Sequence, residues 1–295
     1  MDFDYSRAFN RNIGILSELE QALVSKTRIS LAGVGGIGGS TLLCLVRMGF
    51  QHFKIADLDR FDMDNSNRQV GANTKSYNRP KVEVMKEMAI DINPNCKIEL
   101  YTEGINESSI DSFLEDCDVV VDCIDFFCLS ARVLLHTHAR KAAKSIYMSA
   151  PMGLSATIIG FSPNSISFHE YFDITDEDDK YTNILKFLIG ISPKATHRDY
   201  VDFSPERIAR MRTGPSIASA VNLGVSLLTT EVLMEITKKR PNLYAPYTIQ
   251  IDNFHHQLKK VHLRMGNKGP IQRFKIHVAK KLYASTSQVF LDFIK

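Results

Sequence analysis

A glycine-rich turn and the acid that follows it are the first residues of this chain whose types and spacing suit a defined chemistry. Gly33, Gly35 and Gly38 form a Gly-x-Gly-x-x-Gly pattern. Gly36 lies within it, and Asp57 follows about 20 residues later. Such a turn brings a phosphate against the first amides of a helix, and the acid accepts hydrogen bonds from ribose hydroxyls. The pattern predicts nucleotide binding, although glycine turns also form merely to pack a strand against a helix, and it does not choose between NAD, FAD and ATP.

Charged and amide side chains follow the turn at short intervals, and they favour ATP. These residues are Asp59, Asn65, Arg68, Gln69, Lys81 and Asp125. A triphosphate with Mg²⁺ needs cations on its oxygens and an acid on the metal, whereas a nicotinamide cofactor needs no such group. Each segment falls where the chain leaves the carboxyl end of a predicted strand, which is the ligand side of an open α/β sheet.

With these residues in view, the sequence resembles the family of ThiF, MoeB and the adenylation domains of ubiquitin-activating enzymes. The resemblance covers roughly residues 5–252. The family's glycine loop and ribose aspartate match here, and its Asn-x-x-Arg-Gln motif is complete in Asn65, Arg68 and Gln69. The resemblance implies an ATP-dependent adenylyltransferase that activates a carboxylate as its acyl-adenylate and releases pyrophosphate. The carboxylate belongs to a ubiquitin-like protein, a peptide or a small molecule, and the sequence does not decide between them.

The resemblance also implies roles for charged residues outside that motif. Lys81 would contact the ATP phosphates, and Asp125 would bind Mg²⁺. Tyr5-Ser6-Arg7 looks like the family's Tyr-x-Arg, whose arginine reaches the ATP of the partner subunit, so a homodimer is expected. Arg11 is a rival for Arg7 in that role.

Each of these residues has a structural interpretation as well. Arg68 and Lys81 are then surface cations, the commonest fate of such residues. Asp125 then caps a helix that begins at Phe126, which is compatible with metal binding. Asp59 is then an ordinary loop acid.

The cysteines set this chain apart from many relatives. They are Cys44, Cys96, Cys117, Cys123 and Cys128. None forms a Cys-x-x-Cys pair, so we predict no zinc site. The presumed crossover loop, about residues 173–212, lacks the cysteine with which some relatives form a thioester or persulfide. All five are expected on strands and helices as small buried apolar groups, and the chemistry is expected to stop at the adenylate.

The histidines are expected to be structural or solvated. His136 and His138 fall within a predicted helix, and His255 and His256 in a hairpin turn. His197 lies in the presumed crossover loop and is the histidine that merits a test of acid–base function.

Alternating strands and helices position these residues. Parallel strands are predicted at residues 27–32, 52–57, 97–102, 118–122 and 145–149, with helices after the glycine turn and at residues 80–92 and 131–143. Further on, we predict antiparallel strands at 155–161 and 165–168, a polar loop at 173–200 with a short helix at 184–190, a long helix after 216, and a hairpin at 247–264. The predicted fold is α/β, a Rossmann-like doubly wound, mainly parallel sheet extended by antiparallel strands.

The chain divides on this prediction into an N-terminal helical arm (residues 1–26), an ATP-binding adenylation domain (27–264) and a basic C-terminal helical tail (265–295). Its 295 residues are 44% hydrophobic with a net charge of +3, as in ordinary soluble proteins, and no affinity for DNA is expected. Neither a signal peptide nor a membrane-spanning run of roughly 20 apolar residues is evident, so a cytoplasmic protein is expected.

The stretch from residue 259 to 281, which runs into the tail, carries cations and no acid. The cations are Lys259, Lys260, Arg264, Lys268, Arg273, Lys275, Lys280 and Lys281. A solvated helix face is the favoured interpretation, and docking onto an acidic partner or anionic lipid is the alternative. Two alternatives to the function also stay open: a dinucleotide-dependent oxidoreductase, and a non-catalytic scaffold subunit of the same family.

Overall fold

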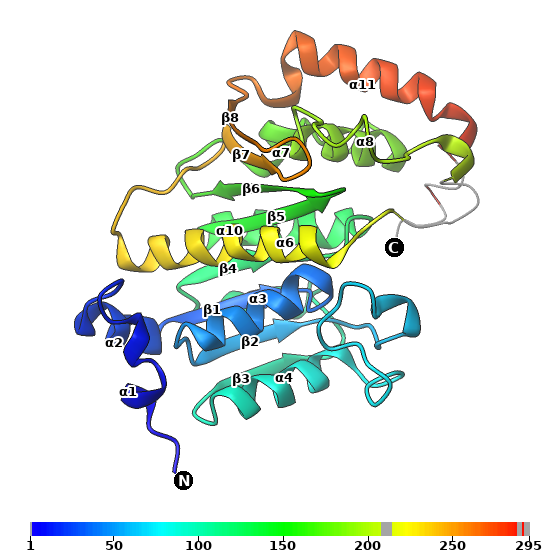
Figure 1. Ribbon diagram of the computed structural model, residues 1–295. Coiled ribbons are helices and arrows are strands. Elements are labelled where there is room, and N and C mark those ends of the chain that lie inside the picture. The colour runs from blue at the N-terminus through cyan, green and yellow to red at the C-terminus, as the bar shows by residue number, and fades with distance from the viewer. Residues whose placement is uncertain (1, 208–213, 288–290, 292–295) are drawn as a thin grey trace.

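Apolar runs from both halves of the sequence form one eight-stranded sheet (Figure 1). The computed structural model describes residues 2–207, 214–287 and 291. Its strands, in chain order, are β1 (Arg28–Ala32), β2 (His52–Ala56), β3 (Lys97–Tyr101), β4 (Val119–Asp122), β5 (Ile146–Met152), β6 (Ser155–Phe161), β7 (Tyr247–Asp252) and β8 (Gln257–His262). Their order in the sheet is β3-β2-β1-β4-β5-β6-β7-β8.

The first five strands run parallel, and the last four pair antiparallel, so that β5 belongs to both parts. The register is level at the carboxyl ends, because Ala32 of β1 pairs with Ala56 of β2 on one side and with Asp122 of β4 on the other. Residues that follow these three strands therefore emerge side by side. The predicted fold, a mainly parallel doubly wound sheet with an antiparallel extension, is confirmed.

Helices cover both faces of the sheet. They are α1 (Tyr5–Ala8), α2 (Glu18–Lys26), α3 (Gly36–Arg47), α4 (Lys81–Ile92), α5 (Ile110–Leu114), α6 (Leu129–Lys141), α7 (Phe168–Phe172), α8 (Lys180–Ile191), α10 (Ala218–Thr237) and α11 (Pro270–Leu282), with short 3₁₀ turns η1 (Asn10–Asn12), η2 (Met63–Asn65), η3 (Gly266–Lys268) and η4 (Ala284–Thr286). Helices α2, α3, α4 and α10 share one core, and α5 to α8 share the other. Helix α11 packs on α8, outside these two layers.

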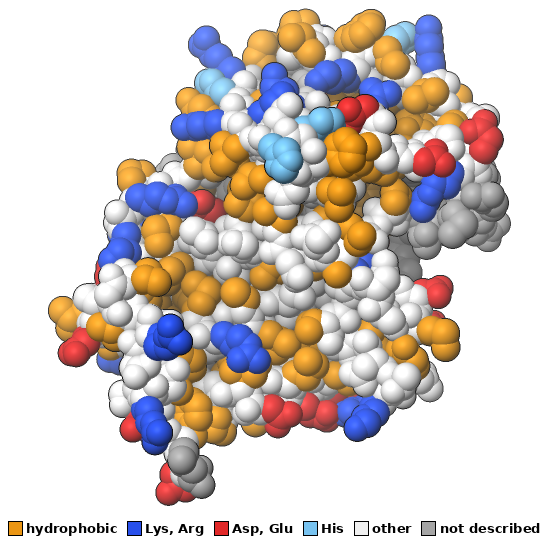
Figure 2. Space-filling model, in the orientation of Figure 1, with side chains coloured by type: hydrophobic (Ala, Val, Ile, Leu, Met, Phe, Trp, Pro, Cys, Tyr) orange, Lys and Arg blue, Asp and Glu red, His pale blue; other side chains and the backbone are white. Residues whose placement is uncertain are grey.

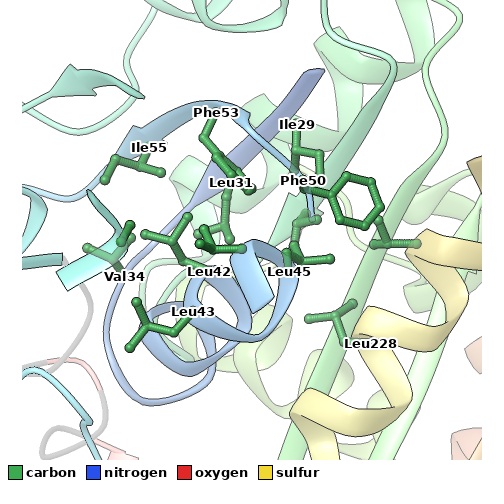
Figure 3. Close-up of a cluster of buried hydrophobic side chains, with 14 of the residues drawn as sticks. Ile29, Leu31, Val34, Leu42, Leu43, Leu45, Phe50, Phe53, Ile55 and Leu228 are labelled. Carbon is green, nitrogen blue, oxygen red and sulfur yellow. The ribbon is translucent and has the colours of Figure 1, made fainter. Parts of the chain in front are cut away.

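The core beneath the glycine turn is aliphatic. Leu42 and Leu45 of α3 pack on β1 and β2, and Leu228 brings α10 against the same cluster (Figure 3). Each is fully buried, which contributes about 1.5–3 kcal/mol of stability per side chain. This packing fixes the direction of α3 and therefore of its first turn.

Helix α10 is the one described helix that is long and apolar enough to cross a membrane. Half of it is buried inside the protein, and it packs on α3, β5 and β6. Such burial is what the central helix of a folded domain shows, so we interpret α10 as a core helix.

The prediction of a strand at residues 165–168 is wrong. Ser162–Ser165 forms a turn, and the chain continues into α7 instead. The Ser167 hydroxyl accepts a hydrogen bond from the Glu170 amide (3.2 Å), and the Glu170 carboxylate accepts one from the Ser167 amide (2.9 Å). This capping box starts a helix whose aromatic side chains at helical spacing face the core.

The polar stretch after α7 is more ordered than predicted. The short helix expected at residues 184–190 is the twelve-residue helix α8, which Asp179 caps by accepting a hydrogen bond from the Thr182 amide (2.6 Å). Residues 208–212 of the predicted crossover loop lie outside the described residues, as do 288–290 and 292–295 of the predicted tail.

Candidate nucleotide site

The glycine turn is packed too closely for side chains at two of its positions. Gly33 has a φ of +88°, and a Cβ there would lie 2.3 Å from the Cys123 carbonyl oxygen. A Cβ on Gly38 would lie 1.8 Å from the Gly33 carbonyl oxygen. Helix α3 begins at Gly36, and its N-cap, Gly35, has no side chain to cap the first amides. The first turn of α3 is therefore available to a phosphate.

Asp57 follows β2 and is tied to the turn. One carboxylate oxygen accepts a hydrogen bond from the Val34 amide (2.8 Å), and the other accepts one from the Asp59 amide (2.9 Å). Burial raises the pKa of Asp57, and the nearby Lys81 charge opposes that rise. The carboxylate is thus held in one orientation beside the phosphate-binding amides, where a ribose is expected.

Lys81 is the first residue of α4, and it lies against Asp59. The two side chains form an ion pair of 3.2 Å in which the Lys81 side chain is 7% exposed and that of Asp59 is 40% exposed. A second contact, from the Lys81 amide to the Asp59 carbonyl (3.0 Å), fixes the start of α4. A buried ammonium at this edge is positioned rather than freely solvated, which argues against the surface-cation interpretation.

The segment from Asn65 to Gln69 runs along the other side of the turn. The Asn65 side chain accepts a hydrogen bond from the Asp62 amide (3.0 Å) and thereby closes η2. Arg68 donates to the Asp64 carbonyl (2.9 Å), and its Cγ lies 3.7 Å from where a Cβ on Gly36 would be. The structure thus brings Arg68 to the start of α3.

Gln69 is buried beside the same turn. It is 7% exposed, and its amide group lies 3.7 Å from the Cβ position of Gly35. Its Oε1 atom is buried and has no hydrogen-bond partner among the described residues. An unpaired buried acceptor next to a glycine turn fits a site that a polar ligand completes.

Asp125 is exposed in the otherwise half-buried loop after β4. Its carboxylate accepts a hydrogen bond from the Phe127 amide (3.0 Å). The predicted helix start at Phe126 is wrong, because α6 begins at Leu129 with Cys128 as its N-cap. Asp125 therefore holds a turn before the helix instead of capping it.

A buried cluster that the sequence did not reveal holds this loop. Arg132 of α6 donates to the Asp122 carboxylate (2.8 Å), to the Ile124 carbonyl and to the Asp125 carbonyl (3.3 Å). His136 lies 3.0 Å from the same Asp122 carboxylate. Burial alone raises the pKa of Asp122, but the Arg132 charge and the His136 hydrogen bond outweigh it and the pKa is lowered.

The acids at this edge suit Mg²⁺ as one carboxylate ligand, not as a complete coordination shell. Among residues 2–207, 214–287 and 291, no group of three or more His, Cys, Asp or Glu is arranged to hold a metal ion. Mg²⁺ in nucleotide enzymes typically has one or two carboxylates and completes its shell with phosphate oxygens and water. Asp125, exposed beside the turn, is suited to be such a carboxylate.

Arg7 and Arg11 do not join the other predicted residues. The Tyr5 hydroxyl donates to the Gly49 carbonyl (2.8 Å), just beyond the end of α3. Helix α3 has twelve residues and is therefore about 18 Å long. The N-terminal segment thus lies at the far end of α3 from the glycine turn, as Figure 1 shows for α1 and α2. Within one chain neither arginine reaches the site.

The histidines are mostly structural, as predicted. His136 is buried within the Asp122 cluster, and His138 bonds Asp111 (2.9 Å). His197 is 4% exposed, and burial lowers its pKa to about 4, against a smaller opposing effect of Asp252. It is therefore neutral near pH 7 and unsuited to exchange protons there.

The prediction that all five cysteines lie on strands or helices is wrong for four of them. Cys44 lies within α3, whereas the other four lie in loops close to the ends of helices or strands. Burial raises the pKa of Cys96 to about 11 and that of Cys123 well above its ordinary value. Neither is a ready thiolate.

Comparison with known proteins places this arrangement in a family. The sequence is 31% identical over 130 residues to the tRNA threonylcarbamoyladenosine dehydratase of Bacillus subtilis, which covers 43% of this chain and 50% of that protein. It is 29% identical over 163 residues to the adenylyltransferase and sulfurtransferase UBA4 of Candida glabrata, covering 54% and 37%. The chain thus spans half or less of the length of these two relatives.

Solved structures share the fold. The Microcin C7 biosynthetic enzyme MccB in complex with N-formylated MccA has a TM-score of 0.67 at 16% identity and covers 92% of this chain and 77% of its own. PaaA has a TM-score of 0.65 at 15% identity, covering 89% and 75%. A model of the ThiF family matches residues 9–270. This chain of 295 residues therefore belongs to the ThiF family.

Proposed function

We propose that the protein is an ATP-dependent adenylyltransferase that activates a carboxylate. The observation that carries this proposal is the grouping of Asp57, Arg68 and Lys81 around the first turn of α3. A ribose acceptor, a phosphate-binding helix start and two cations are what ATP requires. The relatives named as adenylyltransferases support the same activity.

In the proposed reaction, a substrate carboxylate oxygen attacks the α-phosphorus of ATP. A P–O bond forms, the bond to the β-phosphate breaks, and pyrophosphate leaves. Asp57 orients the ribose, the turn amides receive the phosphates, and Arg68 and Lys81 neutralise the developing charge. Asp59 holds Lys81 in place. Asp125 would hold Mg²⁺, which would supply further neutralisation of the pyrophosphate charge.

The amide residues support this arrangement. Asn65 shapes the turn that carries Arg68, and Gln69 offers its unpaired carbonyl oxygen to a donor on the nucleotide. Arg132 positions the Asp125 loop without touching the substrate. Chemistry here consists of orientation and charge stabilisation, because no group of the protein is bonded to the substrate.

The carboxylate that is activated belongs to a peptide, a small protein or a small molecule. The titles of solved MccB structures pair that enzyme with MccA, and this precedent favours testing peptide carboxyl termini first. ATP–pyrophosphate exchange against a set of candidate carboxylates tests the proposal. Exchange that depends on one of them is expected, whereas retention of NAD and not of ATP on a filter would favour an oxidoreductase.

We also expect that no cysteine captures the adenylate. Replacing all five cysteines by alanine or serine should leave exchange and product formation intact, because burial disfavours the thiolate at Cys96, Cys117 and Cys123. Mass spectrometry of the parent protein after turnover gives an independent check. An adduct that survives denaturant, is released by a thiol and disappears with one replacement would contradict this expectation.

A further inference from the structure

The outer surface of α11 is apolar where a solvated helix would be polar. Its side chains Ile271, Phe274, Val278 and Leu282 are 70%, 68%, 39% and 46% exposed. At 3.6 residues per turn these positions lie within an arc of about 80°, so they form one continuous row, the α11 stripe. The sequence analysis favoured a solvated face, with docking as the alternative, and an apolar row of this length is what the docking alternative requires.

The stripe does not arise from a loosely packed helix. On the opposite side of α11, Gln272 and Ile276 are buried, at 3% and 8% exposure. The Gln272 amide donates to the Asn267 side chain (3.2 Å), and Lys275 donates to the Pro193 carbonyl (2.6 Å). The helix is therefore fixed against the protein with the stripe turned outward.

Cations accompany the stripe. No Asp or Glu occurs from Asn253 to Leu291, a segment with eight Lys and Arg residues. Arg273 and Lys281 are exposed on α11 itself, and Arg264 is exposed between β8 and the helix. Figure 2 shows Lys and Arg side chains among hydrophobic ones over this end of the molecule.

The segment between α7 and α8 supplies acids on the neighbouring element. Asp173 and Asp178 lie 3.0 and 2.6 Å from the Lys186 ammonium. Asp176, Glu177 and Asp179 are exposed. The eight Lys and Arg side chains of residues 253–291 outnumber these five acids, so this end of the molecule keeps an excess of positive charge.

We propose that α11 is a docking helix for an anionic lipid surface. An exposed apolar row on an outward-facing helix, with Lys281 at its edge and further cations on the same end of the molecule, matches the acyl boundary and anionic headgroups of such a surface. A second copy of this chain fits less well, because a two-fold interface would place the same cationic surface against itself. An acidic protein partner would have to supply a groove to receive this convex ridge.

Vesicle co-sedimentation tests the proposal with phosphatidylcholine vesicles and with vesicles that also contain phosphatidylserine. The protein should bind the anionic vesicles, less so at high salt. Ile271→Ser with Phe274→Ser should lower the partition coefficient at least about tenfold. Arg273→Glu with Lys281→Glu should lower it by at least a similar factor of about ten. Matched controls on α2, which packs on α10, are Leu19→Ser and Lys26→Glu, and they should change it little.

The chain contains no Trp, so Phe274→Trp introduces a single fluorescent reporter. Its emission should shift to shorter wavelength with anionic vesicles and be quenched by brominated acyl chains, whereas Leu19→Trp should not respond. No binding to anionic vesicles, or equal binding by the stripe variants, would overturn the proposal. The proposal would also be overturned if light scattering showed a dimeric parent and monomeric stripe variants, because the stripe would then join two copies of the chain.

Discussion

At the scale of single residues, the orientation of Asp57 determines what the nucleotide edge can bind. Each of its carboxylate oxygens accepts one backbone amide, from Val34 and from Asp59. A carboxylate offers about four lone-pair positions, so acceptor capacity remains on both oxygens for two vicinal hydroxyls. The two amides hold this capacity in a fixed direction before any ligand arrives, which lowers the entropy lost on binding.

The cations at this edge are predicted to act on phosphate. Arg68→Ala and Lys81→Ala should each lower the rate constant of ATP–pyrophosphate exchange about 10- to 150-fold, the loss of a charged hydrogen bond of about 1.5–3 kcal/mol. Lys75→Ala is the matched control, an exposed cation on the loop between them. Urea unfolding checks that each variant folds. Parent-like exchange in both site variants would refute their assignment.

The glycine turn provides a test of packing. Gly38→Ala should destabilise the protein by more than about 3 kcal/mol, because its methyl group would lie 1.8 Å from a backbone oxygen. Gly36→Ala should stay within about 1 kcal/mol of the parent, since its nearest neighbour, a Val221 methyl, is 3.6 Å away. Urea unfolding of both variants measures the difference. Equal stability would mean that α3 begins in another place.

Residue spacing predicted the glycine turn, Asp57 and the Asn-x-x-Arg-Gln motif, because these act close to where they stand in the chain. It did not predict the pair of Asp122 and Arg132. Ten residues separate them, and their contact depends on α6 beginning at Leu129. A start at Phe126 would place the turn between β4 and α6 differently, so no short-range pattern identifies Arg132.

At the scale of elements, the helical signals that the sequence analysis missed were local ones. Ser167 and Glu170 have the spacing of a capping box, and α7 begins there. The tight Ser-Pro-Asn turn at residues 162–164 suggested a hairpin and therefore a strand instead, because such turns often join antiparallel strands. The central parallel strands were predictable, since β4 is an apolar run that is buried throughout and β1 is buried after Arg28.

The crossover segment contains a group that should make stability depend on pH. His197 has a pKa of about 4 in the folded chain and about 6.5 when unfolded. Protons therefore bind the unfolded chain first, so stability is fully present above about pH 6.5 and falls as pH drops toward 4. At about pH 5 the loss from this group should be about 2 kcal/mol relative to neutral pH.

Urea unfolding at both pH values, for the parent and for His197→Gln, isolates this contribution. The variant cannot take up the proton, so its stability should fall less between neutral pH and the acid value. His136 also has a pKa lowered by burial and is present in both proteins, so its effect cancels. The same decrease in both proteins would show that His197 titrates normally.

At the scale of the whole molecule, the level register of β1, β2 and β4 gathers the site, and the length of α3 keeps the N-terminal segment away from it. Tyr5 is anchored beyond the far end of α3. An arginine next to it can contribute to a nucleotide site only if that site belongs to a second subunit whose edge faces α1. The family resemblance predicts this for Arg7, with Arg11 as the rival, and a homodimer is its necessary condition.

Mixing two inactive variants tests this arrangement. In a dimer of Arg7→Ala with Arg68→Ala, the site on the Arg7→Ala subunit keeps its own Arg68 and receives Arg7 from its partner. The other site lacks both. If subunits mix freely, half the dimers are mixed and each has one competent site, so activity should return to roughly a quarter of the parent value.

A mixture of Arg11→Ala with Arg68→Ala distinguishes Arg7 from Arg11. If Arg7 acts across the interface, Arg11→Ala alone should retain parent-like exchange, because it removes a cation that no site uses. If Arg11→Ala is inactive and is rescued by Arg68→Ala, the roles are reversed. An Arg7→Ala and Arg68→Ala mixture that stays inactive, while a pull-down through a tag on one variant recovers the other, would mean that Arg7 serves its own subunit. Helix α1 would then have to rearrange so that Arg7 reaches the glycine turn at the other end of α3 in the same chain.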